Sequence, residues 1–224
     1  MALARRKPTE TVEKEFDGIK WGNLEKGEHE GRLVMVADLG LQENVYKGEF
    51  KGNFQQVALG IEIIGKGMTL EDGNTLPRIL WTKPFYVYDK MGEKGTEFKH
   101  YSMFDSSAQP ETVPDWDSQL GKPISVFVEH VNGKGDKAKE IYDNISRLIP
   151  IPEKYQGGVG PAICQTIGIG NCDEEDNAVN KALFGLAKHV FDKRVIPQEK
   201  KEDPSSKVII GEPVAEGVED PFNE

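Results

Sequence analysis

Aromatic and basic side chains are interleaved in three stretches of this sequence. The stretches are VYKGEFKGNF at 45–54, WTKPFYVYDK at 81–90 and KGTEFKHYSMF at 94–104. A groove for a single nucleic-acid strand needs this mixture, because bases stack on flat rings, at about 1–3 kcal/mol per base, while cations follow the phosphates. The candidate contact residues are Tyr46, Lys47, Phe50, Lys51, Phe54, Trp81, Lys83, Tyr86, Tyr88, Lys90, Lys99 and Tyr101.

Only some of these rings can face a ligand, because a half-buried strand turns every second side chain into the core. Along 81–90, the alternation predicts that Phe85 and Val87 point inward. Tyr86, Tyr88 and Lys90 are then predicted to point outward. For the other two stretches, the sequence leaves open which rings belong to the core.

No catalytic or metal-binding pattern accompanies these stretches. The four histidines are scattered without paired ligand spacing, and no serine stands in a nucleophile elbow. The segment GIGNCD lacks the third glycine of a dinucleotide-binding turn, since Asp173 stands there. Cys164 and Cys172 suggest neither a metal motif nor a disulfide framework, and we predict ordinary thiols. We therefore expect no enzyme, no cofactor and no metal site.

Residues 29–152 are predicted to be mostly β-strand. In QVALGIEII (56–64), apolar residues alternate as in a half-buried strand. Further strands are predicted in EGRLVMVADL (30–39), RILWTKPFYVYDK (78–90) and KPISVFVEHV (122–131). In AKEIYDNISRLIPIP (138–152), Ile141, Ile145 and Leu148 fit helical spacing while the ending LIPIP is extended, and a last strand is favoured. Pro84 makes its strand an edge or bulged strand. The basic stretch 45–54 is placed in a loop, and glycine turns join the other strands, which favours an antiparallel barrel or sandwich.

A glycine-rich connector follows residue 152 and leads to a predicted helix. In DEEDNAVNKALFGLAKHVFDKR (173–194), one apolar stripe at helical spacing is formed by Val179, Leu183, Leu186 and Val190. The acids at 173–176 are placed at the start of this helix, where its dipole favours negative charge. We expect the helix to pack on the β domain.

The chain of 224 residues has a formal net charge of -10, and its last segment carries half of that charge. From Glu199 to Glu224 there are eight acids and three bases, which gives -5. The segment is rich in Pro, Ser, Gly and acids, so it is predicted to be disordered. A plain solubilising terminus needs no aromatic ring, so Phe222 favours a partner-binding tip. The predicted tip residues are Glu219, Asp220, Pro221 and Phe222.

No apolar run approaches the roughly 20 residues of a membrane helix. The basic N-terminus is not followed by the apolar stretch of a signal peptide. We therefore expect an intracellular protein without a membrane partner.

The order of these parts resembles that of the OB-fold single-stranded-DNA-binding proteins of tailed bacteriophages. The resemblance is carried by EGRLVMVADLG, the basic stretch after it, QVALGIEI, the aromatic strand and LGKPISVFVEH…EIYDNISRLIPIP, a little over half of the chain. VEDPFNE (218–224) is similar to the acidic tips of bacterial and phage single-strand binders. In the bacterial pattern the phenylalanine is the last residue, whereas Asn223 and Glu224 follow it here.

The resemblance implies an N-terminal arm (1–28), an OB-like barrel (29–152), a connector with a helix packed on the barrel (153–196) and a disordered acidic tail (197–224). It implies a protein that coats single-stranded DNA in replication, recombination or repair, with little sequence specificity. The resemblance also implies that the tip of the tail recruits replication or recombination proteins. From its charge, the tail is predicted to regulate DNA binding by competing for the basic groove. The implied location is cytoplasmic, in the host cell if the protein is phage-encoded, and homo-oligomers are possible.

One alternative uses the same residues differently. An all-β protein-interaction module of a phage replisome or virion would present these rings to another protein. Salt separates the two hypotheses, because strand binding weakens steeply as salt rises.

Overall fold

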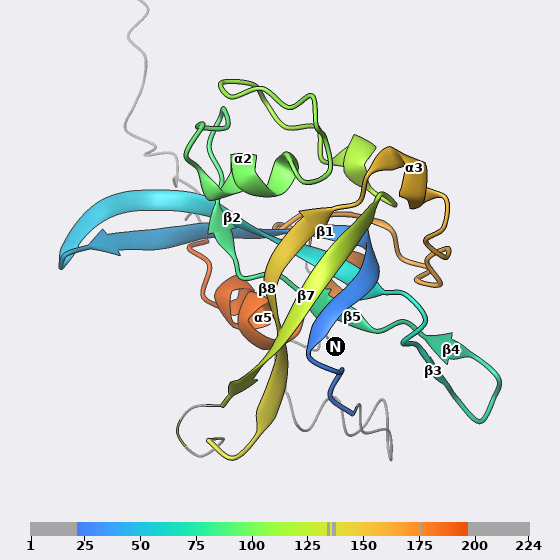
Figure 1. Ribbon diagram of the computed structural model, residues 1–224. Coiled ribbons are helices and arrows are strands. Elements are labelled where there is room, and N and C mark those ends of the chain that lie inside the picture. The colour runs from blue at the N-terminus through green and yellow to red at the C-terminus, as the bar shows by residue number, and fades with distance from the viewer. Residues whose placement is uncertain (1–21, 134, 136–137, 175, 197–224) are drawn as a thin grey trace, which may run out of the picture.

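The computed structural model describes residues 22–133, 135, 138–174 and 176–196. The N-terminal arm up to residue 21 and the acidic tail, with its predicted tip Glu219, Asp220, Pro221 and Phe222, lie outside the described residues. The described part contains one seven-stranded sheet, one two-stranded sheet and a few short helices (Figure 1). The expectation of a mainly β, antiparallel architecture is confirmed.

The large sheet has a Greek-key order. Its strands are β1 (Gly27–Tyr46), β2 (Glu49–Ile63), β5 (Ile79–Trp81), β6 (Phe85–Tyr86), β7 (Pro123–Asn132), β8 (Ile141–Pro150) and β9 (Gly168–Gly170). The order is β5-β2-β1-β7-β8, with β6 also beside β2 and β9 beside β1. The chain passes from β1 to β2 to β5 and then returns by a long connection, so that β7 pairs with β1. Only the β1–β9 pair is parallel among the described strands.

The strand predicted around Pro84 is interrupted there and lies at the sheet edge. Its two parts, β5 and β6, both pair with β2 and flank the proline. This agrees with the prediction, because proline cannot donate to a strand ladder. A separate small hairpin, β3 (Met68–Thr69) with β4 (Thr75–Leu76), fills the connection between β2 and β5.

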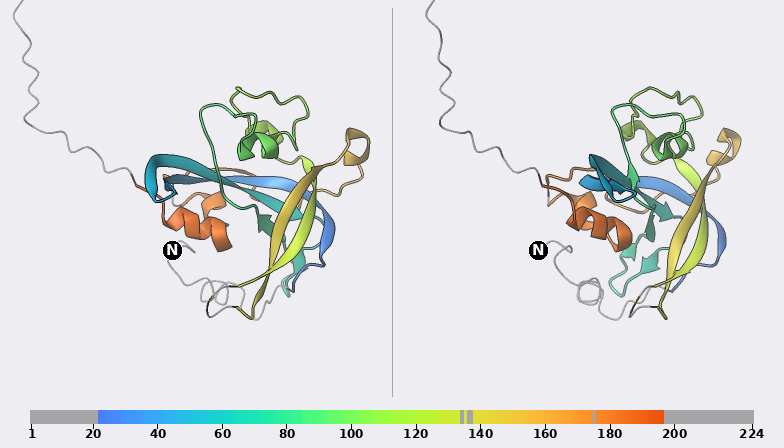
Figure 2. Two further views of the ribbon diagram at one scale, coloured as in Figure 1. Left: turned by 60° about the vertical axis from the view of Figure 1, so that its left-hand side comes forward. Right: turned by 90° about the vertical axis from the view of Figure 1, so that its left-hand side faces the viewer.

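Helices lie on both faces of the sheet (Figure 2). The long connection to β7 carries α2 (Thr96–Tyr101) and a 3-10 turn at Asp117–Gln119. After β8 come α3 (Glu153–Gln156), α4 (Ala178–Lys181) and α5 (Gly185–Asp192). Figure 2 shows α2 on one side of the sheet and α4 and α5 on the other, which gives the molecule two apolar cores.

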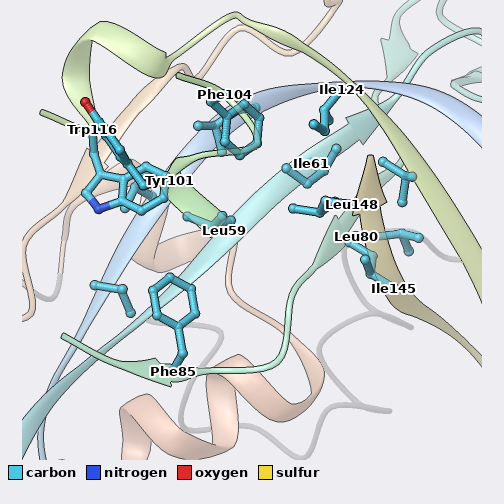
Figure 3. Close-up of a cluster of buried hydrophobic side chains, with 14 of the residues drawn as sticks. Leu59, Ile61, Leu80, Phe85, Tyr101, Phe104, Trp116, Ile124, Ile145 and Leu148 are labelled. Carbon is cyan, nitrogen blue, oxygen red and sulfur yellow. The ribbon is translucent and has the colours of Figure 1, made fainter. Parts of the chain in front are cut away.

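The core on the α2 side collects alternate residues of the strands. Leu59 and Ile61 of β2 meet Ile124 of β7 there (Figure 3). The alternation predicted for β7 is confirmed, since Ile124, Val126 and Val128 are all buried. In β2, however, residues 57–63 are buried throughout, because α4 and α5 cover the second face that the sequence had left to solvent.

The sheet does not close into the predicted barrel. Its outer strands, β5 and β8, lie side by side but do not form a ladder. Leu80 packs near Ile145 and Leu148 across this seam (Figure 3). Beside it, Arg78 donates from Nη2 to Oδ2 of Asp143 over 2.6 Å. Side chains, rather than backbone hydrogen bonds, therefore hold the seam.

Residues 45–54 form a hairpin, so the prediction of a loop was wrong. β1 continues to Tyr46 and β2 begins at Glu49, and the hairpin projects from the sheet as an arm (Figure 1). Lys47 and Gly48 have φ values of 53° and 81°. Two central residues with positive φ give the type I′ turn that matches the twist of a hairpin. Polar and exposed residues dominate both strands of the arm, so the period-two signal of a strand was absent.

The single predicted helix is two short ones. The break falls at Phe184, which is extended, and at Gly185, whose φ of 60° favours glycine. α4 is capped by the Asn177 side chain, which accepts a hydrogen bond from the backbone N–H of Val179. The acids at 173–176 therefore precede the helix and do not form its first turn, contrary to the prediction.

The break also changes which residues face the sheet. Leu186, predicted in the apolar stripe, is 55% exposed. The buried apolar positions are Val179, Leu183, Ala187 and Phe191. The expectation that this segment packs on the β domain is confirmed, because these side chains join the second core with Val34 and Leu39 of β1.

Candidate functional site

A groove lies at the open seam of the sheet. It lies between the β6 segment on one side and residues 145–148 of β8 on the other, and Lys94 and Gly95 with Thr96 and His100 of α2 complete it. We call it the seam groove; its volume is about 520 Å³. Its lining consists of Thr82, Lys83, Pro84, Phe85, Tyr86, Tyr88, Lys94, Gly95, Thr96, His100, Ile145, Ser146, Arg147 and Leu148. Residues about 60 positions apart in the sequence thus share one surface.

The lining of the seam groove is basic. Lys83, Lys94 and Arg147 are its ionised side chains, and it contains no aspartate or glutamate. None of the three is in an ion pair with any residue that the structure describes. Burial lowers the pKa of His100, so this imidazole is mostly neutral at pH 7. In a chain of net charge -10, the groove is a local site of attraction for a polyanion.

Three aromatic rings cluster at the wall formed by β6. Phe54 of β2 contacts Tyr86 and Tyr88 edge to face, with centroid distances of 6.1 and 5.7 Å. Strand pairing causes this arrangement. Tyr86 lies opposite Gln56, so two positions further along the antiparallel pair Tyr88 and Phe54 point to the same face of the sheet as Tyr86. Tyr86 and Tyr88 line the groove, and Tyr88 is 53% exposed. Both rings are therefore available to a flat ligand.

Phe85 and Val87, which alternate with these tyrosines along the chain, point into the core as predicted. Phe85 is buried in the α2-side core, and Val87 packs against that core. The backbone N–H of Val87 donates to the carbonyl of Gln55 over 3.0 Å, which extends the pairing beyond β6. This local pairing fixes which side of the segment faces the groove.

Arg147 of β8 was not among the predicted contact residues. It lies opposite Phe127 of β7, and its guanidinium carbon is 4.8 Å from the centroid of that ring. The ladder shifts by one residue here, since Val128 pairs with Ile145 and leaves Ser146 as an extra residue. The bulge had one signal in the sequence. The apolar residues Ile145 and Leu148 are three positions apart, whereas residues on one face of a regular strand are separated by an even number of positions.

The predicted contact residues divide into four groups. Lys83, Tyr86 and Tyr88 line the seam groove, and Phe54 joins their cluster. Lys47, Phe50 and Lys51 are exposed on the arm, where Lys51 pairs with Glu49; of Tyr46, only its backbone is described. Lys90 and Lys99 are exposed but do not line the groove. Trp81 and Tyr101 lie elsewhere.

Trp81 and Tyr101 serve the two cores. The Trp81 ring packs with the α4–α5 core, and its Nε1 donates to the carbonyl of Ala182 over 3.3 Å. Tyr101 is 6% exposed and meets Trp116 edge to face at 5.1 Å. The Tyr101 ring is therefore covered, the Trp81 ring is partly buried against the second core, and neither residue lines the seam groove.

Neither a metal-ligand cluster nor a disulfide is present among the described residues. Among residues 22–133, 135, 138–174 and 176–196, no three His, Cys, Asp or Glu side chains could hold a metal ion together. Cys164 and Cys172 are free thiols, and burial raises the pKa of Cys172 to about 12. No helix in this part of the chain is long and apolar enough to cross a membrane.

No family model, curated protein or solved structure matches this chain. The function must therefore be inferred from the chemistry of the seam groove and from the order of the strands.

Proposed function

We propose that this protein binds single-stranded DNA with little sequence specificity and coats it during replication, recombination or repair. The observation that carries the proposal is the lining of the seam groove. Lys83, Lys94 and Arg147 stand there without a single acid, beside the outward rings of Tyr86 and Tyr88. In an acidic protein, this combination suits a ligand that is both anionic and flat.

The physical reasons favour a single strand. Stacking on Tyr86 or Tyr88 requires a base whose face is free, and bases in a duplex are already stacked on their neighbours. Stacking is tolerant of sequence because every base has a π face. Each phosphate of a single strand that a cation neutralises contributes about -0.7 to the slope of log affinity against log salt concentration. If Lys83, Lys94 and Arg147 each neutralise one phosphate, the expected slope is about -2.

The strand order supports an OB-like fold. Counting β5 and β6 as one strand, the main strands run β1, β2, β5, β7 and β8, and the fourth returns beside the first. An OB fold is a five-stranded, partly open Greek-key barrel that binds oligonucleotides on its second and third strands and on the loop between its first two. The Phe54–Tyr86–Tyr88 cluster and the arm occupy those positions here.

The acidic tail is proposed, from sequence alone, to regulate this binding. Its five acids from Glu212 onward, with no base among them, can compete with DNA for the basic groove. DNA would then release the tip with Phe222 to replication or recombination proteins.

The test is fluorescence anisotropy of labelled oligo-dT and of a matched duplex, titrated with the full chain between about 50 and 200 mM salt. We expect salt-sensitive binding of oligo-dT and weak binding of the duplex. A Lys83→Gln, Lys94→Gln variant should reduce the salt slope by about 1.4. The control is a Lys66→Gln, Lys193→Gln variant, which removes two exposed lysines outside the groove and should leave the slope unchanged.

A specific observation favours the alternative of a protein-interaction module. Val45 and Phe50 are exposed near the end of the arm, where an apolar pair suits a protein contact. The same titrations separate the two functions. No binding of oligo-dT, or binding that does not respond to salt, would reject the DNA-binding proposal and favour the module.

A further inference from the structure

We propose that the single strand continues out of the seam groove, across β8, to a second subsite on the outer face of β7 and β8. This subsite holds one base against the Phe127–Arg147 pair. The inference rests on the proposed function and extends it, because neither Phe127 nor the surface beyond it belongs to the seam groove.

Arg147 stands between two hollows. On one side it lines the seam groove. On the other, Phe127 lines a second hollow of about 390 Å³ together with Lys26, Gly27, Val128, Glu129 and His130. Since Arg147 lies over the Phe127 ring at 4.8 Å, the pair forms the boundary between the hollows. A strand that contacts Arg147 in the groove therefore has, as its next flat surface, the guanidinium that the Phe127 ring supports.

The local backbone places the pair on the outside. Ser146 is the extra residue of the bulge in β8, and its hydroxyl donates to the carbonyl of Phe127 over 3.1 Å. Ile145 and Leu148 are both buried, whereas Ser146 and Arg147 between them are both exposed. Bulges re-aim side chains in this way and are frequent beside functional sites. β7 and β8 lie side by side here, so the pair spans two strands (Figure 1).

The chemistry of the subsite favours a base over a phosphate. An arginine over an aromatic ring offers a stacking platform that accepts any base. The second hollow has one exposed cation, Lys26, and one exposed acid, Glu129, so its lining has little net charge. Affinity gained there should come from stacking and should respond to salt less than affinity gained in the groove.

The test is a length series of labelled oligo-dT, from about four to about twelve nucleotides, with the full chain and a Phe127→Leu variant. For the shortest oligomers, which fill the groove alone, we expect equal affinity. For the longest, the variant should bind about tenfold more weakly. The control is Phe184→Leu, the same change at an exposed ring on the α4–α5 side, which should match the wild type at every length.

A second variant keeps the test independent of folding. Lys26→Glu changes an exposed side chain and should weaken only the longer oligomers. If both variants bind all lengths as the wild type does, the subsite is wrong while the groove stands. If they lose affinity equally at every length, the strand does not extend past Arg147 and the subsite is again wrong. If the wild type binds no oligomer, the proposed function itself fails.

Discussion

The ring of Tyr88 offers the best-exposed flat surface in the seam groove, at 53% exposure. Its edge-to-face contact with Phe54 holds it in place, so little freedom is lost when a base stacks on it. We predict that Tyr88→Leu weakens binding of oligo-dT by about five- to a hundredfold, the equivalent of one stacked base. Fluorescence anisotropy at fixed salt measures the change.

Tyr155→Leu is the matched control for that variant. Tyr155 is an equally exposed tyrosine on α3 and lies outside the groove. It should bind as the wild type does. Equal losses in the two variants would mean that Tyr88 has no special part in binding.

Glu97 gives a prediction on pH. Its side chain on α2 is 4% exposed, and burial raises its pKa, while the backbone N–H of Tyr88 and the Trp116 indole act in the opposite direction. A raised pKa in the folded state means that folding favours the protonated acid. Stability from this group is therefore complete below its ordinary pKa of 4.5 and is lost as pH rises through the folded-state value.

Glu97→Gln keeps a neutral side chain of the same shape at every pH. We expect the stability of this variant, relative to the wild type, to increase between pH 4.5 and neutral pH. Urea unfolding at several pH values measures the difference. Glu153→Gln, an exposed change on α3, corrects for the loss of one negative charge. A difference that stays constant with pH would contradict the assignment.

Individual contact residues could be predicted only where local alternation decides the direction of a side chain. Tyr86 and Tyr88 were placed correctly because antiparallel pairing with β2 preserves the period of two. Arg147 was missed because its position depends on a bulge and on a partner strand. Trp81 and Tyr101 were included although they pack in the two cores, because an aromatic residue two positions from a lysine gives the same sequence pattern in a core as on a surface.

At the scale of elements, the seam between β5 and β8 depends on one buried carboxylate. Asp143 is 2% exposed and accepts hydrogen bonds from Arg78 and from the backbone N–H of Leu24. His130 Nε2 lies 3.6 Å from its other oxygen. The contacts with Arg78 and Leu24 join β8 to parts of the chain with which it forms no strand ladder, whereas His130 also lies opposite Asp143 in the β7–β8 ladder.

We predict that Asp143→Ala lowers the free energy of unfolding by about 3–5 kcal/mol, because it removes the buried counter-charge of Arg78. Urea unfolding measures the loss. An Arg78→Met, Asp143→Ala variant should lose less than the sum of the two single changes, since the double change removes both members of the ion pair together. Strict additivity would show that the two side chains do not act as a pair.

A strand or helix could be predicted from the sequence where it buries a regular pattern of apolar residues. β7 was found because alternate apolar residues mark its buried face. β8 does not alternate, since Ile145 and Leu148 are three apart, and it was assigned as a strand because its ending LIPIP is extended. The arm was not, because its strands bury almost nothing and depend on pairing with each other. The break at Gly185 was hidden, since apolar residues on both sides of the glycine continue a helical pattern.

At the scale of the whole molecule, charge is divided between a basic groove and acidic surroundings. The chain has a net charge of -10, of which residues 199–224 contribute -5 and the rest -5. At about 0.1 M salt, charges act over roughly 10 Å, so DNA in the groove senses the nearest cations more than the distant acids. The acidic tail matters only if it comes close to the groove.

The last described residues leave the fold near the groove's aromatic cluster. The backbone N–H of Val195 donates to the carbonyl of Leu41 in β1 over 2.7 Å. Gln42, the next residue of β1, pairs with Phe54 of that cluster. The attachment point of the tail is therefore close to the proposed DNA site, which raises the effective concentration of its acids there.

We predict that truncation after residue 198 tightens binding of oligo-dT by about three- to tenfold at low salt, because the competing acids are removed. The gain should shrink as salt rises, since screening weakens tail and DNA alike. A full-length variant with its five acids from Glu212 onward changed to amides separates charge from bulk, and should behave like the truncation. Unchanged or weaker binding by both proteins would show that the tail does not compete for the groove.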